Sequence, residues 1–166
     1  MDVSAYVNEL RAQSTSVVMA TPEIPHLWRE GALVFPSSRD GGFEITIQPE
    51  ASGVVVFTDV GLHIHLDASP DEAVQDALGL VRDLLSPDMR IRELRAGGRG
   101  YRWLLERRES NGWLCEAKTG LFLWNYFGRR GERVYQNQQL PGRLASMAAE
   151  MTGGPTNSGA SAAEPE

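Results

Sequence analysis

The chain contains 166 residues, of which 42% are apolar and 23% are charged, and its formal net charge is −6. This length suits one domain, and the apolar fraction excludes a wholly disordered chain. No run approaches the roughly 18 apolar residues of a membrane-spanning helix, and the negative net charge excludes a simple polybasic nucleic-acid binder.

The first expected elements are a helix and a short strand. Asp2 is suited to the N-cap position, and apolar residues follow it at helical spacing: Val3, Tyr6, Val7 and Leu10. Because this pattern ends near residues 14–16, we expect a short amphipathic helix. Two prolines disfavour helix over residues 21–25. Residues 32–35 then predict a short strand.

Three further strands are expected in the centre of the chain. Residues 43–48 alternate apolar and polar side chains, residues 54–58 form an apolar run, and residues 62–66 alternate again. A period of two is typical of a strand with one buried face. The connections at Gly53 and Gly61 are too short for parallel crossovers, so the three strands predict an antiparallel meander.

A capped helix follows the meander. Ser69 suits the N-cap, Pro70 the first helical position and Glu72 the third position of a capping box. The acidic first turn also favours the positive end of the helix dipole. An apolar stripe runs behind the cap and predicts a helix that packs on one face of the sheet: Ala73, Val74, Ala77, Leu78, Val81, Leu84 and Leu85.

The last third of the chain predicts more strands. Glycine-containing turns separate apolar or aromatic segments, and the run Gly97-Gly98-Arg99-Gly100 fits a hairpin turn better than a phosphate-binding loop. Asn111-Gly112 is a second hairpin signal, and residues 128–131 are expected to form a loop. A short helix is expected after Pro141. The expected strands are 89–94, 101–107, 113–118, 121–127 and 133–137.

Together these elements predict an α+β fold. The meander, the core helix and the later strands form an antiparallel β-sheet arrangement with helices packed on one face. We expect a single domain over residues 1–151. Residues 152–166 contain no large apolar side chain and predict a disordered C-terminal tail.

The cysteine content and the first residues bear on the compartment. Cys115 is the only cysteine, so no intrachain disulfide can form, and no signal peptide is visible. We therefore expect a cytoplasmic protein. Strand alternation would place Cys115 on one apolar face with Trp113 and Ala117, which predicts a buried and unreactive thiol.

One strand carries side chains that suit metal binding. His63, His65 and Asp67 alternate with apolar residues and share one face, at a spacing that lets two imidazoles and a carboxylate meet one cation. Such a site would support a small metal-dependent enzyme. Polar residues on the exposed face of a half-buried strand have the same pattern, so the three side chains equally suit a partner-binding surface.

The sequence offers little support for other catalytic arrangements. There is no Gly-x-Ser-x-Gly elbow, no P-loop and no His-Glu-x-x-His motif. A nucleophilic pair of Cys115 with a histidine would need a cleft that an apolar strand face does not offer. We therefore assign no catalytic residue and no cofactor.

Charge is strongly segregated along the chain. Residues 1–88 contain 14 acidic residues against 4 arginines, whereas residues 89–143 contain 12 basic residues against 5 glutamates. Arginines interleaved with aromatic residues are typical of protein-binding hot spots and also of single-stranded nucleic-acid surfaces. Together with His63, His65 and Asp67, the candidate partner-binding residues are Arg99, Arg102, Trp124, Tyr126, Arg129 and Arg130.

The segment from residue 54 to residue 67, the capped helix and the strands at 89–94 and 101–106 form one recognisable block. This block resembles small bacterial proteins that serve as immunity proteins beside polymorphic toxins. In that group a strand with a His-x-His-x-Asp-like run precedes a helix and a β-hairpin. The resemblance covers residues 43–107 and implies a non-enzymatic α+β protein that binds and blocks one partner.

We therefore expect a bacterial, non-enzymatic protein-interaction domain whose partner is another protein and which has no membrane partner. Two alternatives remain from the residues themselves. One is a metal-dependent enzyme centred on His63, His65 and Asp67. The other is a nucleic-acid-binding protein that uses the arginines and aromatic residues of the later strands.

Overall fold

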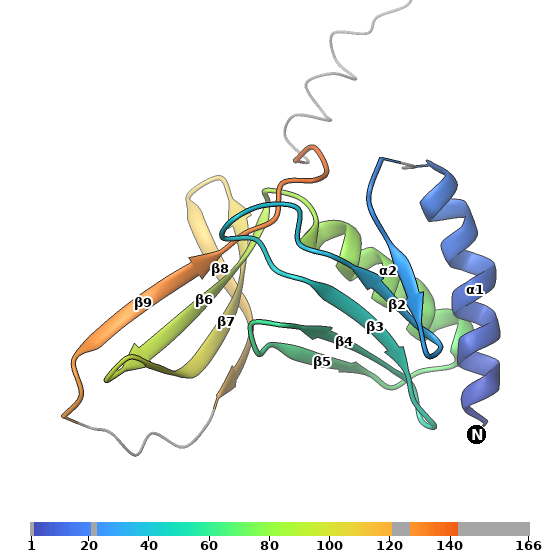
Figure 1. Ribbon diagram of the computed structural model, residues 1–166, viewed down its shortest axis with the longest axis horizontal. Helices are drawn as coiled ribbons and strands as arrows, with labels where there is room; N and C mark the ends of the chain where they lie inside the picture. Colours follow the sequence, from blue (N-terminus) through green and yellow to red (C-terminus); the bar gives the residue numbers. More distant parts are fainter. Residues whose placement is uncertain (1, 21–22, 121–126, 143–166) are drawn as a thin grey trace, which may run out of the picture.

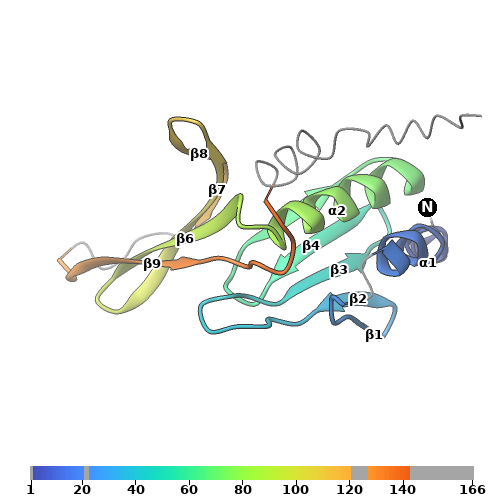
Figure 2. The same cartoon turned by 90° about the horizontal axis from the view of Figure 1, so that it is seen from above.

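The computed structural model describes residues 2–20, 23–120 and 127–142. Within them the chain forms two helices and two antiparallel sheets, which confirms the predicted α+β fold. Both helices lie on the same side of the first sheet, and the second sheet extends away from it beyond the end of α2 (Figures 1 and 2). No helix in the described ranges is long and apolar enough to cross a membrane.

Helix α1 spans Val3–Ala20 and is longer than the sequence pattern predicts. It begins at the predicted cap, where the Ser4 amide donates to Asp2 Oδ1 at 3.1 Å. The helix passes through the polar residues 14–16, where the Ser14 and Thr15 hydroxyls donate to the Arg11 carbonyl. Gln13 also donates to Asp71 at 2.7 Å, which joins α1 to the start of α2.

The first sheet is the predicted meander, extended by two strands. It contains β1 (Leu27–Arg29), β2 (Ala32–Phe35), β3 (Ile45–Pro49), β4 (Val54–Thr58) and β5 (His63–Leu66), in this order. Each strand pairs antiparallel with the next. Ile47 pairs with Val56 and Val56 with Ile64, so their apolar side chains share the helix-facing side.

Helix α2 spans Pro70–Leu84 with Ser69 as its N-cap, as predicted. The cap differs in detail from a capping box. The Ser69 hydroxyl donates to Glu72 Oε2 at 2.7 Å and makes no side-chain cap bond to the backbone. The predicted apolar stripe is buried against the first sheet.

The second sheet contains β6 (Met89–Ala96), β7 (Arg99–Glu109), β8 (Gly112–Gly120) and β9 (Arg130–Tyr135), in the order β8-β7-β6-β9. The Gly97–Gly98 turn is confirmed: both glycines have positive φ, at 59° and 83°, as a two-residue hairpin turn requires. Glu109 pairs with Gly112, so the second turn is one residue earlier than Asn111-Gly112.

The loop predicted at residues 128–131 is wrong in its second half. Arg130 and Gly131 belong to β9, where they pair with Ala96 and Arg95 of β6. Cross-strand hydrogen bonding to β6 supplies the order that the glycine-rich local sequence does not. The predictions for residues 121–126, for the helix after Pro141 and for the tail at 152–166 fall outside the described residues.

One hydrophobic core extends over both sheets and both helices. It runs from Tyr6 and Leu10 of α1, through the helix-facing side of the first sheet, to Met89, Ile91 and Leu105 of the second. This apolar side of the second sheet is called its inner face below, and the opposite side its outer face. Hydrogen bonds join the segment after β9 to the two sheets' connecting regions. Gln136 donates to the Pro87 carbonyl, and the Asn137 side chain forms hydrogen bonds with the backbone of Phe43.

We expect Tyr6→Phe to lower the free energy of unfolding by about 1 kcal/mol. The Tyr6 hydroxyl donates to the Ala68 carbonyl at 2.9 Å, and the ring is fully buried. Urea unfolding followed by circular dichroism measures the change. Tyr101→Phe is the matched control, since the Tyr101 hydroxyl has no hydrogen-bond partner in the described chain, and equal losses in both variants would contradict the prediction.

Candidate functional site

The predicted partner-binding residues lie in two separate places. His63 and His65 lie on β5, the edge strand of the first sheet, and Asp67 follows directly after it. The predicted arginines lie in or beside the second sheet. Trp124 and Tyr126 lie outside the described residues.

The histidine strand presents two exposed imidazoles. The His63 and His65 rings lie 5.5 Å apart between centroids, in an edge-to-face arrangement. Their cross-strand neighbours are Phe57 and Val55 of β4, and 38% of Phe57 is exposed. Among the described residues, no group of three or more His, Cys, Asp or Glu side chains is arranged to hold a metal ion. The strand therefore presents a mixed polar and apolar edge.

The predicted arginines of the second sheet gather at the turn of the β6–β7 hairpin. Ala96 of β6 pairs with Arg99 on one side and Arg130 on the other. The Arg130 guanidinium lies 5.5 Å from the centre of the Tyr101 ring, and the Gly97 amide donates to the Arg129 carbonyl at 3.0 Å. Arg102 is exposed further along β7. Arg99, Arg102 and Arg130 thus form one end of the outer face, and Arg129 lies directly before β9.

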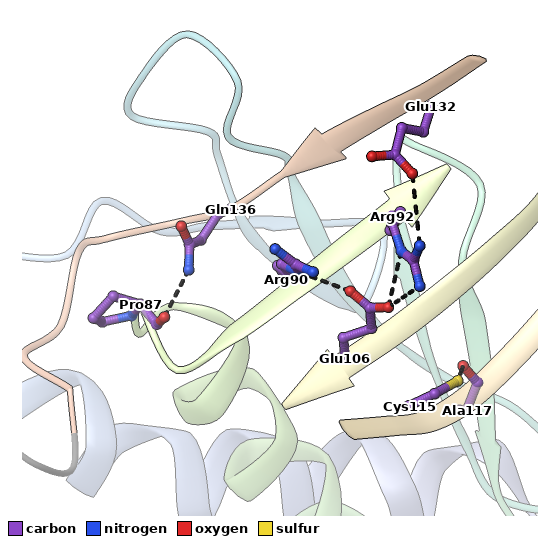
Figure 3. Close-up of polar contacts among 8 residues, drawn as sticks. All are labelled: Pro87, Arg90, Arg92, Glu106, Cys115, Ala117, Glu132 and Gln136. Atoms are coloured by element: carbon purple, nitrogen blue, oxygen red, sulfur yellow. Dashed lines mark hydrogen bonds and ion pairs between the residues drawn. The ribbon is translucent and has the colours of Figure 1, made fainter. Parts of the chain in front are cut away.

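The centre of the outer face is a cluster that sequence reasoning missed. Arg90 Nε donates to Glu106 Oε2 at 2.7 Å, and Arg92 Nε donates to Glu106 Oε1 at 2.9 Å (Figure 3). Only 3% of the Glu106 side chain is exposed. The hydrogen bond to Glu106 raises the pKa of Arg92 above its usual value. One buried carboxylate therefore orients two arginine side chains on an otherwise exposed sheet face.

Trp113 completes this cluster on β8. The Arg90 guanidinium lies 4.0 Å from the centre of the Trp113 ring, and the Arg108 guanidinium lies 5.1 Å from it. Arg108 and Trp113 are directly paired residues of β7 and β8. Contacts of this kind are attractive because the ring face carries negative charge. The side chains of Arg90, Arg92, Arg108, Glu106 and Trp113 are called the Glu106 cluster below.

A second cluster of charged side chains lies on the other side of the second sheet, and it contains more carboxylates than cations. Arg107, the next residue after Glu106, forms ion pairs with Asp83 of α2 at 2.9 Å and with Glu116 of β8. These interactions raise the pKa of the Arg107 guanidinium, with the hydrogen bond to Glu116 contributing most. Here one arginine meets two carboxylates and ties α2 to the second sheet. The Glu106 cluster instead contains more cations than carboxylates.

The prediction of a buried Cys115 is wrong. Leu105 pairs with Ala117, whereas Glu106 pairs with Cys115, so Glu116 is an extra residue in β8. This β-bulge interrupts the alternation that the prediction assumed. The Cys115 thiol is consequently exposed beside Glu106 on the outer face and lies 3.5 Å from the Ala117 carbonyl oxygen (Figure 3).

The outer face as a whole is basic. Strand register places seven basic residues on it among the described residues, against the two carboxylates of Glu106 and Glu132. Glu132 lies 3.6 Å from Arg92, and Val134 beside it is 42% exposed. The basic residues are Arg90, Arg92, Arg99, Arg102, Arg108, Lys118 and Arg130.

Comparison with protein-family models, with curated proteins and with solved structures found no match for this chain.

Proposed function

We propose that this chain is a non-enzymatic, cytoplasmic protein-binding domain of the bacterial immunity type, which binds and occludes a partner protein. The observation that carries this proposal is the Glu106 cluster. Arginine and tryptophan are the residues that most often dominate the binding energy of protein interfaces. Here they are exposed or half-buried on a sheet face, and a buried carboxylate orients two of the arginines, Arg90 and Arg92.

Preorganisation is the physical reason why this arrangement favours binding. An arginine that becomes immobile on binding loses side-chain entropy, and this loss weakens the complex. In the Glu106 cluster, ion pairs and ring contacts restrict Arg90 and Arg92 before any partner arrives. Val134 and the half-buried Leu94 and Leu104 add apolar area to the same face.

A reconstituted complex tests the proposal. The chain is crosslinked in its native cells, the captured protein is identified, and the two purified proteins are mixed and measured by calorimetry. We expect a stable complex in which Trp113→Ala weakens binding about tenfold or more. Trp28→Ala is the matched control, because Trp28 is a 39% exposed tryptophan of the first sheet, and we expect it to leave the Kd within about twofold.

A growth assay tests the immunity role itself. Expression of the partner alone is expected to arrest cell growth, and co-expression of this chain to restore it, whereas the Trp113→Ala chain restores growth poorly. Circular dichroism first verifies that the variant is folded. The proposal fails if no purified partner binds, or if Trp28→Ala and Trp113→Ala weaken binding equally.

A further inference from the structure

We propose that the partner presents an acidic protein segment to the outer face, and that its carboxylates dock on Arg90 and Arg108 beside Trp113. This inference rests on the proposed function and specifies the chemistry of the partner. Three observations support it: the donors that Arg90 leaves open, the charge balance of the face, and the way in which the Trp113 ring is occupied.

Arg90 retains its best donors for a ligand. Its guanidinium contacts Glu106 through Nε alone, and 23% of its side chain is exposed. Its two terminal nitrogens have no hydrogen-bond partner in the described parts of the chain. A guanidinium with both terminal nitrogens open matches the two oxygens of a carboxylate. Arg108 is exposed against the same ring and supplies a second cation.

Within the described residues, the carboxylates of the outer face compensate its cations only in part. Both oxygens of Glu106 already accept hydrogen bonds from Arg90 and Arg92, so this carboxylate has little capacity left. Glu132 lies beside Arg92 and not beside Trp113. Around Arg107 the opposite holds, since two carboxylates surround one arginine. An anionic partner would relieve the excess positive charge of the outer face, which is a form of electrostatic complementarity.

The occupied Trp113 ring favours protein carboxylates over single-stranded nucleic acid. Single strands bind basic surfaces by stacking bases on exposed aromatic rings. The Trp113 ring is half-buried and already carries two guanidinium groups, at 4.0 and 5.1 Å from its centre. A base would have to displace them.

Fluorescence anisotropy with three matched probes tests the inference. The probes are a labelled peptide of alternating Asp, Glu and Gly, the same peptide with Asn and Gln in place of Asp and Glu, and a labelled oligothymidine of similar length. At about 20 mM salt we expect only the acidic peptide to bind well, and its Kd to rise severalfold at about 200 mM salt.

Arginine variants locate the binding. We expect Arg90→Gln and Arg108→Gln each to weaken acidic-peptide binding about tenfold, because each removes a charge-assisted contact. Arg29→Gln is the matched control: it removes one exposed arginine from β1, in the first sheet, and should change the Kd less than about twofold. Unfolding curves establish that all three variants are folded.

The results separate this inference from the proposed function. The inference is overturned if the acidic peptide does not bind, if Arg29→Gln weakens binding as much as Arg90→Gln, or if the oligothymidine binds more tightly. Measurements on the reconstituted partner complex distinguish failure of this inference from failure of the proposed function. A complex that Trp113→Ala weakens but that salt and Arg90→Gln leave unchanged supports a protein-binding outer face and rejects an acidic partner.

Discussion

Asn137→Ala is expected to lower the free energy of unfolding by about 3–4 kcal/mol. The Asn137 side chain forms two hydrogen bonds with the backbone of Phe43: Oδ1 accepts from the amide at 3.1 Å, and Nδ2 donates to the carbonyl at 3.2 Å. Both residues are fully buried. Alanine would leave a buried donor and a buried acceptor unpaired, out of reach of water, and each costs about 1–3 kcal/mol.

Urea unfolding followed by circular dichroism and tryptophan fluorescence measures this loss. Gln138→Ala is the matched control, because Gln138 is the exposed neighbour of Asn137 on the same segment, and its change should stay within about 0.5 kcal/mol. An Asn137→Ala protein with the unfolding midpoint of the unmodified chain would show that the segment after β9 does not secure the first sheet.

Gly53→Ala is expected to destabilise the chain by about 3 kcal/mol. Gly53 is buried in the turn between β3 and β4, where its carbonyl accepts a hydrogen bond from the Glu50 amide at 2.9 Å. A Cβ atom added there would lie 2.3 Å from the Leu66 carbonyl oxygen. Because this neighbour is backbone at the end of β5, the strands must separate to admit the methyl group.

Gly79→Ala is the comparison variant, and we expect it to change the stability of the chain in the opposite direction. Gly79 is an exposed residue in the middle of α2, and a Cβ added there meets nothing within 4 Å. Alanine should stabilise the helix by about 0.5–1 kcal/mol, since glycine loses more backbone entropy on folding. If both variants shift the urea midpoint in the same direction, the close approach of Gly53 to β5 is not the cause of its effect.

Local patterns were sufficient to predict much of the fold. The apolar stripe behind Ser69 predicts α2, and the alternation in residues 43–48 and 62–66 predicts the meander, because each period matches the geometry of one element. The double-glycine turn is likewise a local signal, since residues with positive φ are needed there. The end of α1 was missed because tertiary contacts, such as the hydrogen bond from Gln13 to Asp71 of α2, outweigh the weak helix preference of residues 14–16.

The candidate site could not be predicted from local sequence patterns. Register counted from the Gly97–Gly98 turn would pair Arg90 with Leu105 and leave Glu106 on the other face. In the structure an extra residue in β7, next to Arg102, shifts the register, and Arg90 pairs with Glu106 instead. Gly100 pairs with Arg95 directly before this extra residue.

The sequence by itself thus determined which segments are helices and strands, the order of the meander, and the concentration of basic and aromatic residues after residue 88. Only the tertiary structure decided which of those residues meet. Two β-bulges set the pairing of β7 with β6 and with β8, which brings Arg90, Arg92 and Trp113 around Glu106 and exposes Cys115. The physical reason is that packing between strands, and not local preference, determines where a sheet accepts an extra residue.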